Sequence, residues 1–515
     1  MRITAIIFLI FTCSKINGQS LKPDYTPADL YNAITQNPAL KENFAGEPFA
    51  WHAANDGDLF VKAYRVWKDT AWLNWGIKYY EFLLSNMKSA PDGYIGLIGP
   101  HFRENGLWTN EVISDALVAN IILEFCELVM NDKVLKNSYG KKATEYVSFC
   151  KKNMIEKWDK RELWKEAGEY GAYIFGNDFV RPNDFSKLII DDKIQDHSLL
   201  SIQYNISNSM GITNLRLYRI TGDQFYRDKA EKLFFRLKSN FQFFNNHYLW
   251  SYWNPFYEKD ILFDSNTCKH WVGVHGFRPG YQAIEVSQII EAYHTGVVFD
   301  STDIQRIINT NLDVMWNKST EHPEYIMSTG QRPDSLQNKD VQSRGTLWGS
   351  LEDFSQTIQN LNRKENEGDY ASKDIGGKIQ QAYFDSIVVK TPPSFKRKYA
   401  DGRPIIVNDV PFGNSPDLRY TGVIPYIIKP GENSYVIAKS ITTGNLTVDL
   451  YTKDGSTKIR TMYSGKIIGD GDGLKGFQMI KWNGTDPNKK FTFKGDYLVR
   501  WTLNGKYRNC AITIE

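Results

Sequence analysis

The chain has 515 residues, of which 42% are hydrophobic and 23% are charged, and its formal net charge is +3. This composition is typical of a soluble globular protein, and the length favours two or three domains unless one of them is a toroid. Such a small net charge excludes a strongly basic nucleic-acid binder and a polybasic membrane binder. We therefore predict no nucleic-acid partner, and a monomer or small oligomer.

The first residues have the pattern of a secretory signal peptide. Arg2 is followed by an apolar run from Ile3 to Phe11 and then by small and polar residues, which predicts a leader over residues 1–18. The run is too short to span a bilayer, so no membrane span is expected. The protein is predicted to be secreted or periplasmic, and Cys13 leaves an outer-membrane lipoprotein as an alternative.

Helical hairpins account for residues 25–370. "YRVWKDTAW" from Tyr64 and "YRITGDQFY" from Tyr218 align without a gap, and each ends one helix, turns at an Asp and begins another. Matched hairpins at a long interval indicate an array. Helical pairs are also predicted over 110–129 with 139–158 and over 281–293 with 303–316. The pattern predicts an α/α toroid, with a straight solenoid as the alternative.

The remaining sequence is rich in Pro, Gly and β-branched residues. We predict a β-rich linker or small β region over 371–425 and a β-sandwich over 426–515. The last part resembles the immunoglobulin-like module of flagellar hook-capping proteins. The residues that carry this resemblance are Trp482, Gly484, Asp486, Gly495, Tyr497, Arg500 and Gly505.

Cysteine spacing does not indicate a metal site. Cys126, Cys150, Cys268 and Cys510 are predicted to be buried thiols, and Cys126 with Cys150 is the one pair that neighbouring helices could bring into a disulfide. The "DGDG" at 470–473 is similar to a fragment of a calcium loop. We expect no required cofactor, and a structural calcium ion remains an alternative.

The stretch "KHWVGVHGFRPGYQ" at 269–282 carries the strongest chemical signal. His270, His275 and Arg278 precede a helix predicted to begin at Pro279, and Tyr281 lies in its first turn. A helix N-terminus favours anions, and an arginine can hold a carboxylate in a bidentate contact. A uronate is therefore a suitable guest for this loop.

At these residues the chain resembles the α/α-toroid polysaccharide lyases that act on alginate, glucuronan and chondroitin. The resemblance implies β-elimination on an acidic polysaccharide. Tyr281 would be the base and the acid, His275 a base or a neutraliser, and Arg278 with Asn208 the carboxylate clamp. Asn205 is a substitute for Asn208.

Aromatic and polar loops before several helices are predicted to bind substrate. The first group is predicted to form a sugar-stacking wall, with a buried aromatic plug as the alternative. It consists of His247, Tyr248, Trp250, Tyr252 and Trp253. The others are His101, Arg103, Trp108, Trp51, His52 and His270.

Two other functions fit the same sequence. A glycoside hydrolase of unsaturated uronyl oligosaccharides would use paired carboxylates, and its candidates are Asp56, Asp58, Glu111, Asp115, Asp191, Asp192 and Asp196. A non-catalytic surface protein would bind glycan in an aromatic groove. The hydrolase predicts new reducing ends without a new double bond, and the binder predicts no turnover.

Overall fold

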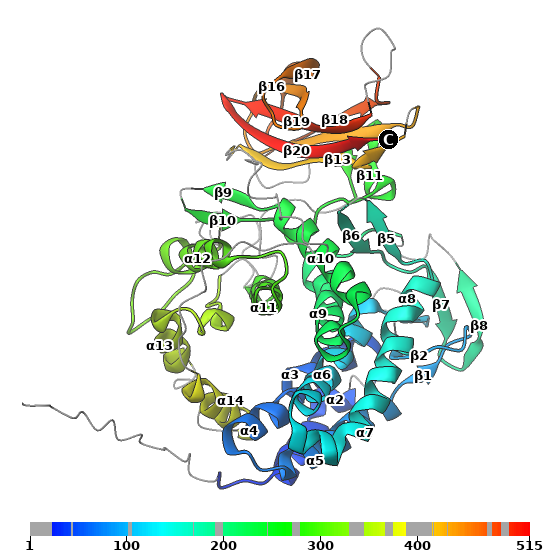
Figure 1. Ribbon diagram of the computed structural model, residues 1–515, viewed down its shortest axis with the longest axis vertical. Helices are drawn as coiled ribbons and strands as arrows, with labels where there is room; N and C mark the ends of the chain where they lie inside the picture. Colours follow the sequence, from blue (N-terminus) through cyan, green and yellow to red (C-terminus); the bar gives the residue numbers. More distant parts are fainter. Residues whose placement is uncertain are drawn as a thin grey trace, which may run out of the picture.

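The computed structural model describes residues 23–42, 45–100, 106–167, 169–190, 199–244, 246–269, 279–328, 345–365, 374–387, 415, 417–429, 431–470, 476–485 and 494–515. Helices form a ring, and a β-rich region lies against one side of it (Figure 1). This confirms the predicted fold class, a mainly α chain with an α/α toroid followed by β structure.

The helical elements follow one another in hairpins along the chain. They are α1 (Pro27–Thr35), α2 (Pro38–Glu42), α3 (Gly46–Gly57), α4 (Leu59–Trp67), α5 (Ala71–Ser85), α6 (Val112–Asn131), α7 (Lys133–Cys150), η1 (Lys151–Glu156), α8 (Lys157–Lys160), α9 (Tyr204–Thr221), α10 (Gln224–Ser239), η2 (Glu258–Asp260), η3 (Phe263–Ser265), α11 (Pro279–Thr295), α12 (Ser301–Asn309), η4 (Thr310–Met315), η7 (Gly349–Leu351), α13 (Gln356–Glu365) and α14 (Ile375–Ser386).

The sequence repeat at Tyr64 and Tyr218 is confirmed as a repeated turn. Lys68 and Gly222 both end their helices in the left-handed conformation, with φ of 57° and 75°, and their N–H groups donate to the carbonyls of Tyr64 and Tyr218. In the following turn, Asp223 caps α10 by accepting from the N–H of Phe225 at 3.0 Å. The shared Tyr-Arg-x-x-x-Asp pattern therefore encodes one turn used twice.

Five helical segments run parallel around the ring. Along α6 and α9, Asn120 donates to the Ser209 carbonyl at 3.0 Å, and further along Glu127 meets Arg219 at 2.5 Å. Because early residues contact early residues and late ones contact late ones, the two helices point the same way. The same register relates α3–α4 to α6, α9 to α11, and α4 to α14, where Lys62 donates to Gln380 at 2.7 Å. The N-terminal ends of these helices therefore lie at one end of the ring.

A charge belt joins the other ends of these helices. We define it as Arg65, Glu124, Glu127, Arg216, Arg219 and Glu291. Arg219 of α9 contacts Glu127 of α6 at 2.5 Å and Glu291 of α11 at 3.3 Å, so one side chain links three helices. Arg65 of α4 contacts Glu124 at 3.1 Å. The repeated Tyr-Arg pair thus supplies both Arg65 and Arg219 to the same belt.

The helical ring extends beyond the boundary predicted at residue 370. α14 lies at Ile375–Ser386 and packs parallel to α4, and α13 is antiparallel to it, with Gln359 donating to the Ile387 carbonyl at 2.8 Å. The segment assigned to a β-rich linker therefore begins with a ring helix. Its amphipathic pattern is short and contains two adjacent glycines, which concealed it in the sequence.

Short strands lie between the helices. They are β1 (Lys88–Ser89), β2 (Ile95–Gly96), β3 (Ile98–Pro100), β4 (Trp108–Asn110), β5 (Trp164–Ala167), β6 (Tyr170–Tyr173), β7 (Asp178–Arg181), β8 (Asp184–Ile190), β9 (Gln242–Phe244), β10 (His247–Leu249), β11 (Ile261–Leu262) and β12 (Thr267–Cys268). The order β3-β4-β7-β8 forms a four-stranded sheet beside the start of α6.

The C-terminal region contains two sheets. The strands are β13 (Leu418–Ile424), β14 (Ile427–Ile428), β15 (Ser434–Ser440), β16 (Gly444–Thr452), β17 (Lys458–Ile467), β18 (Phe477–Trp482), β19 (Gly495–Leu503) and β20 (Lys506–Ile514). One sheet has the order β13-β15-β18 and the other β14-β20-β19-β16-β17. Both contribute to one apolar cluster, so this region is a sandwich that begins at Leu418. The immunoglobulin-like assignment remains a prediction.

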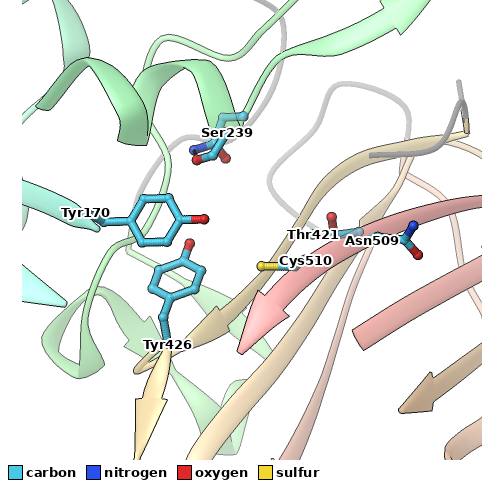
Figure 2. A pocket seen from close by; sticks show the side chains of 7 residues that line it. Tyr170, Ser239, Thr421, Tyr426, Asn509 and Cys510 are labelled. Carbon is cyan, nitrogen blue, oxygen red and sulfur yellow. Dashed lines mark hydrogen bonds between the residues drawn. The ribbon is translucent and has the colours of Figure 1, made fainter. Parts of the chain in front are cut away.

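The sandwich and the ring share a close-packed interface. The rings of Tyr170 from β6 and Tyr426 pack with their centroids 4.4 Å apart and their planes tilted by 32°. They line a cavity of about 10 Å³ together with Ser239, Thr421 and Cys510 (Figure 2), which is room for about one water molecule. The same apolar cluster includes residues of α10, α11 and α12 as well as of both sheets. The two parts are therefore not independently packed.

The four described cysteines are buried free thiols, as predicted, and the alternative of a Cys126–Cys150 disulfide does not form. Cys126 and Cys150 are buried free thiols, and burial raises the pKa of both. Among the described residues, no group of three His, Cys, Asp or Glu side chains is arranged to hold a metal ion. Residues 471–473 of the calcium-like stretch lie outside the described part of the chain. None of the described helices combines the length and apolarity that a membrane span requires.

Candidate functional site

The N-terminal ends of the parallel helices place several candidate residues at one end of the ring. Glu47 and Trp51 lie in the first turns of α3, Glu111 is the N-cap of α6, and Asn205 lies in the first turn of α9. Tyr281 lies in the first turn of α11, which begins at Pro279 as the sequence predicts. Helix N-termini carry a partial positive charge, which favours an anionic guest at this end.

Polar side chains line the contact between α9 and α11 at this end, and we call them the polar seam. We define it as Asn205, Asn208, Gln282, Glu285 and Gln288, all of which are buried. The Gln288 amide donates to the Asn205 carbonyl at 2.8 Å and to the Ser209 hydroxyl at 3.0 Å, which fixes the two helices together. Residues three apart on a helix share a face, so each helix turns one polar stripe toward the other.

Asn208 is the least satisfied member of the polar seam. It is 1% exposed, and within the described residues neither its Oδ1 nor its Nδ2 has a hydrogen-bond partner. The Oδ1 of Asn205 and the Nε2 of Gln282 are likewise without described partners. Burying an amide without partners costs about 1–3 kcal/mol, so such groups usually meet water or a ligand.

Glu285 lies in the middle of the seam and is fully buried. Its Oε2 accepts a hydrogen bond from the indole Nε1 of Trp250 at 2.6 Å. Burial raises the pKa of Glu285 well above its ordinary value, and the Trp250 bond opposes that shift. The environment therefore favours a neutral carboxyl that can donate as well as accept a hydrogen bond.

Tyr281 lies at the start of the same helix face. Its side chain is half-buried, and its ring centroid is 6.2 Å from that of Tyr252. Tyr281 directly precedes Gln282 and lies one turn before Glu285 on α11. The structure thus brings Tyr281 and the predicted clamp residues Asn205 and Asn208 to adjoining helices.

The predicted sugar-stacking wall is largely buried. Tyr248, Trp250, Tyr252 and Trp253 are each less than 10% exposed, so the alternative of a buried aromatic cluster is what the structure shows for them. Their polar atoms support neighbouring elements, because Tyr248 donates to Asp303 at 2.9 Å and Trp253 to the Ser201 carbonyl at 2.7 Å. His247 is half-buried, and burial lowers its pKa.

A second group forms where α3 meets α6. Trp51 donates to Glu47 at 3.0 Å. Burial raises the pKa of Glu111 to about 8, with smaller contributions from the nearby charges of Glu47 and Asp178. Burial also raises the pKa of Glu47. The structure therefore brings together two loops that the sequence treated separately, and it places an acid suited to proton donation at this end of the ring.

The other described candidates have structural partners or lie at the edge of this group. Asp115 is completely buried and contacts Lys157 Nζ at 2.6 Å, so it belongs to an internal ion pair. Burial and Asp58 raise the pKa of Asp56 to about 6. His52 lies four residues before Asp56 on α3, and Trp108 pairs in β4 with its ring 5.9 Å from that of Phe185.

Several predicted residues lie outside the described part of the chain. They are His101, Arg103, Asp191, Asp192, Asp196, His270, His275 and Arg278. Their predicted roles stay predictions.

Sequence reasoning missed Gln282, Glu285, Gln288 and Glu47. The signal for the first three was present, because polar residues recur every third position in "YQAIEVSQ" inside an otherwise apolar helix. The apolar periodicity of the same stretch predicts the helix but does not distinguish these polar positions. Glu47 has no distinguishing signal, because a glutamate near a helix start is ordinary.

Comparisons with known proteins give only distant likenesses. No known family matches the chain, and no curated protein resembles it in sequence. A family 76 α-mannanase of Bacteroides thetaiotaomicron has 11% identity and a TM-score of 0.33, covering 65% of this chain and 69% of its own. A cellobiose 2-epimerase of Bacillus thermoamylovorans has 16% identity and a TM-score of 0.35, covering 68% and 80%. A family 76 mannosidase of Bacteroides thetaiotaomicron has 13% identity and a TM-score of 0.33, covering 66% and 85%. At these values the activity has to be argued from the site itself.

Proposed function

We propose that this protein is an exported carbohydrate-active enzyme, a lyase that cleaves a uronate-containing polysaccharide by β-elimination. The observation that carries the proposal is the polar seam, where the buried Asn208 amide of α9 has no partner among the described residues. Across the seam, α11 carries the buried Glu285, and Tyr281 lies one turn before it on the same helix. The chemistry needs no cofactor.

The polar seam suits the first requirement of elimination. The proton at C5 of a uronate becomes acidic only when the adjacent carboxylate is neutralised. An amide N–H of Asn208 or Gln282 and the O–H of a neutral Glu285 are donors to such a carboxylate. Because these side chains carry no negative charge in that state, they accept the anion without repulsion. Arg278 is proposed to complete the clamp.

Tyr281 suits the second requirement, the proton transfer. In the proposed step the deprotonated Tyr281 oxygen removes the proton from C5, a double bond forms between C4 and C5, and the bond from C4 to the leaving oxygen breaks. The same phenol then returns the proton to that oxygen, so atoms and charge balance. His275 is proposed to assist as a second base or as a neutraliser.

The test is the absorbance near 235 nm of the new double bond, followed with alginate, glucuronan, ulvan, pectin and glycosaminoglycans in turn. Wild-type protein is expected to raise the absorbance with one of them, and Tyr281→Phe to lower the rate by at least about 100-fold, as for loss of a general acid–base group. Tyr139→Phe is the matched control, because that hydroxyl bonds Asn74 at 2.9 Å on an exposed surface. Equal rates for Tyr281→Phe and wild type would remove the tyrosine from the chemistry.

Glu111 favours one second candidate, a glycoside hydrolase. A carboxyl with a pKa of about 8 keeps its proton at neutral pH and can protonate a leaving group, as the acid of a hydrolase must. New reducing ends without absorbance at 235 nm, lost in Glu111→Gln, would establish this function instead. Binding without either product would leave a glycan-binding protein.

A further inference from the structure

Residues 251–269, which we call the docking segment, lie between the ring and the sandwich. On the ring side this segment holds the start of α9. The N–H of Tyr204, the first residue of α9, donates to the Tyr252 carbonyl at 3.1 Å, and the Trp253 indole donates to the Ser201 carbonyl at 2.7 Å. The residues that lead into the polar seam are therefore fixed by the docking segment and not only by helix packing.

Asp260 strengthens this attachment. Its side chain is completely buried, its Oδ1 accepts from the N–H of Ser201 at 2.9 Å, and its Oδ2 accepts from the N–H of Phe256 at 2.6 Å and of Tyr257 at 3.1 Å. Three backbone donors on one buried carboxylate make charge-assisted bonds of the strong kind. The Asp260 side chain thus joins the backbone of the docking segment to the residues that directly precede α9.

On the other side, Asn266 joins the docking segment to β18. Its Nδ2 donates to the Phe477 carbonyl at 2.5 Å, and its Oδ1 accepts from the N–H of Met479 at 2.7 Å. β18 is the edge strand of the sheet β13-β15-β18. The Asn266 side-chain amide therefore forms hydrogen bonds with this exposed edge, as the backbone of one more strand would. Asn266 has φ of 51°, a conformation that asparagine tolerates better than most residues.

Apolar contacts surround this pair of hydrogen bonds. Ile261 and Cys268 of the docking segment form a buried cluster with Ile424, Ile437, Phe477, Met479 and Tyr420 of the sandwich. The Tyr420 hydroxyl donates to the Pro255 carbonyl at 3.3 Å, and the rings of Phe263 and Tyr435 lie 5.2 Å apart. The docking segment is therefore attached to the sandwich along most of its length.

We propose that the sandwich helps to hold in place the site at the N-terminal ends of α9 and α11. Asn266 is the positioning residue, and it acts through the docking segment. The sandwich fixes β18, Asn266 fixes the docking segment on β18, and the docking segment fixes the residues that precede the polar seam. The effect of Asn266 on turnover rests on the proposed function, whereas its effect on the backbone order of residues 199–208 does not.

Hydrogen exchange measured by mass spectrometry tests the structural step. Asn266→Gly removes the amide and keeps a residue that accepts positive φ, so backbone strain does not confuse the result. Exchange in peptides covering 199–208 and 255–268 is expected to become about tenfold faster, the factor given by loss of one or two net hydrogen bonds. Exchange in α7, far along the ring, is expected to stay unchanged.

Asn504→Gly is the matched control. Asn504 also has positive φ, 50°, and its amide donates to Asp417 at 3.2 Å in an exposed turn of the same sandwich. It is expected to leave exchange in 199–208 at the wild-type rate. If Asn266→Gly and Asn504→Gly gave the same exchange rate in that peptide, the sandwich would not hold residues 199–208 in place, and the proposal would be overturned.

Kinetics distinguish positioning from general stability. On the uronan that the wild type cleaves, Asn266→Gly is expected to lower kcat about tenfold and to change KM little. Asn266→Asp keeps the acceptor for the N–H of Met479, so its kcat is expected to lie between those of the wild type and Asn266→Gly. A fall in the amount of folded enzyme would instead lower the active-site concentration without changing kcat per folded molecule. If the wild type cleaved no uronan, the proposed function would fail, and the exchange experiment would still decide this inference.

Discussion

Gly96 lies where the side chains of an internal ion pair leave no room for a methyl group. A Cβ at this position would be 2.4 Å from Asn110 Oδ1 and 2.6 Å from Lys157 Nζ. Lys157 donates to Asn110 at 2.6 Å, to the Ile95 carbonyl at 3.0 Å and to Asp115 at 2.6 Å, so all three of its donors are used. No member of this group can move without leaving a buried charge or amide unpaired.

We therefore expect Gly96→Ala to lower the free energy of unfolding by about 1–3 kcal/mol, as overpacking does in a filled core. Urea denaturation followed by circular dichroism measures it. Gly140→Ala in α7 is the control, because the nearest atom to its Cβ is the flexible Lys136 side chain at 3.3 Å. That variant should be neutral or slightly more stable. Equal effects of the two substitutions would contradict the packing argument.

Glu111 gives a prediction for pH. Its pKa rises from 4.5 to about 8 on folding, so the folded protein holds a proton that the unfolded chain releases. The contribution of this group to stability is therefore complete below pH 4.5 and is lost as the pH rises towards 8. The melting temperature of wild type should fall relative to that of Glu111→Gln across this range. Parallel curves for the two proteins between pH 5 and 8 would show that the carboxyl titrates normally.

At the scale of helices, Arg219 connects α6, α9 and α11 through the charge belt. We expect Arg219→Met to cost about 2–3 kcal/mol, because Glu127 and Glu291 lose charge-assisted bonds in a partly buried position. Lys142→Met is the control, since Lys142 contacts Glu81 and Glu145 on an exposed surface, where such pairs contribute about 0–1 kcal/mol. Thermal denaturation of both variants checks the difference, and equal losses would mean that the belt does not stabilise the ring.

Most helices were predictable because their patterns are local. The hairpins at Tyr64 and Tyr218 and the start of α11 at Pro279 follow from turn residues and apolar spacing, and the structure confirms them. α14 was missed because its pattern is weak, and its place in the ring depends on distant partners such as Gln380 with Lys62. The sequence also does not predict that Trp250 and its neighbours are buried, because a cluster of aromatic residues suits a cleft and a core equally well.

At the scale of the molecule, the ring and the sandwich are expected to unfold together. One apolar cluster includes residues from both, and the cavity between them has room for about one water molecule. Differential scanning calorimetry of the full chain should show a single transition with equal calorimetric and van't Hoff enthalpies. Two resolved transitions would mean that the sandwich folds as a separate unit. The docking segment would then not couple the sandwich to the ring.

The sequence by itself determined the helical hairpins, their repeated turn, the β-rich C-terminal region and the residue types at the start of α11, because all of these depend on neighbours along the chain. Only the tertiary structure decided that α14 closes the ring, that Glu47 lies near Glu111, and that Asn208, Gln282 and Glu285 form one polar seam. The reason is physical. Parallel packing of helices distant in sequence sets which side chains meet, and burial then sets their charge.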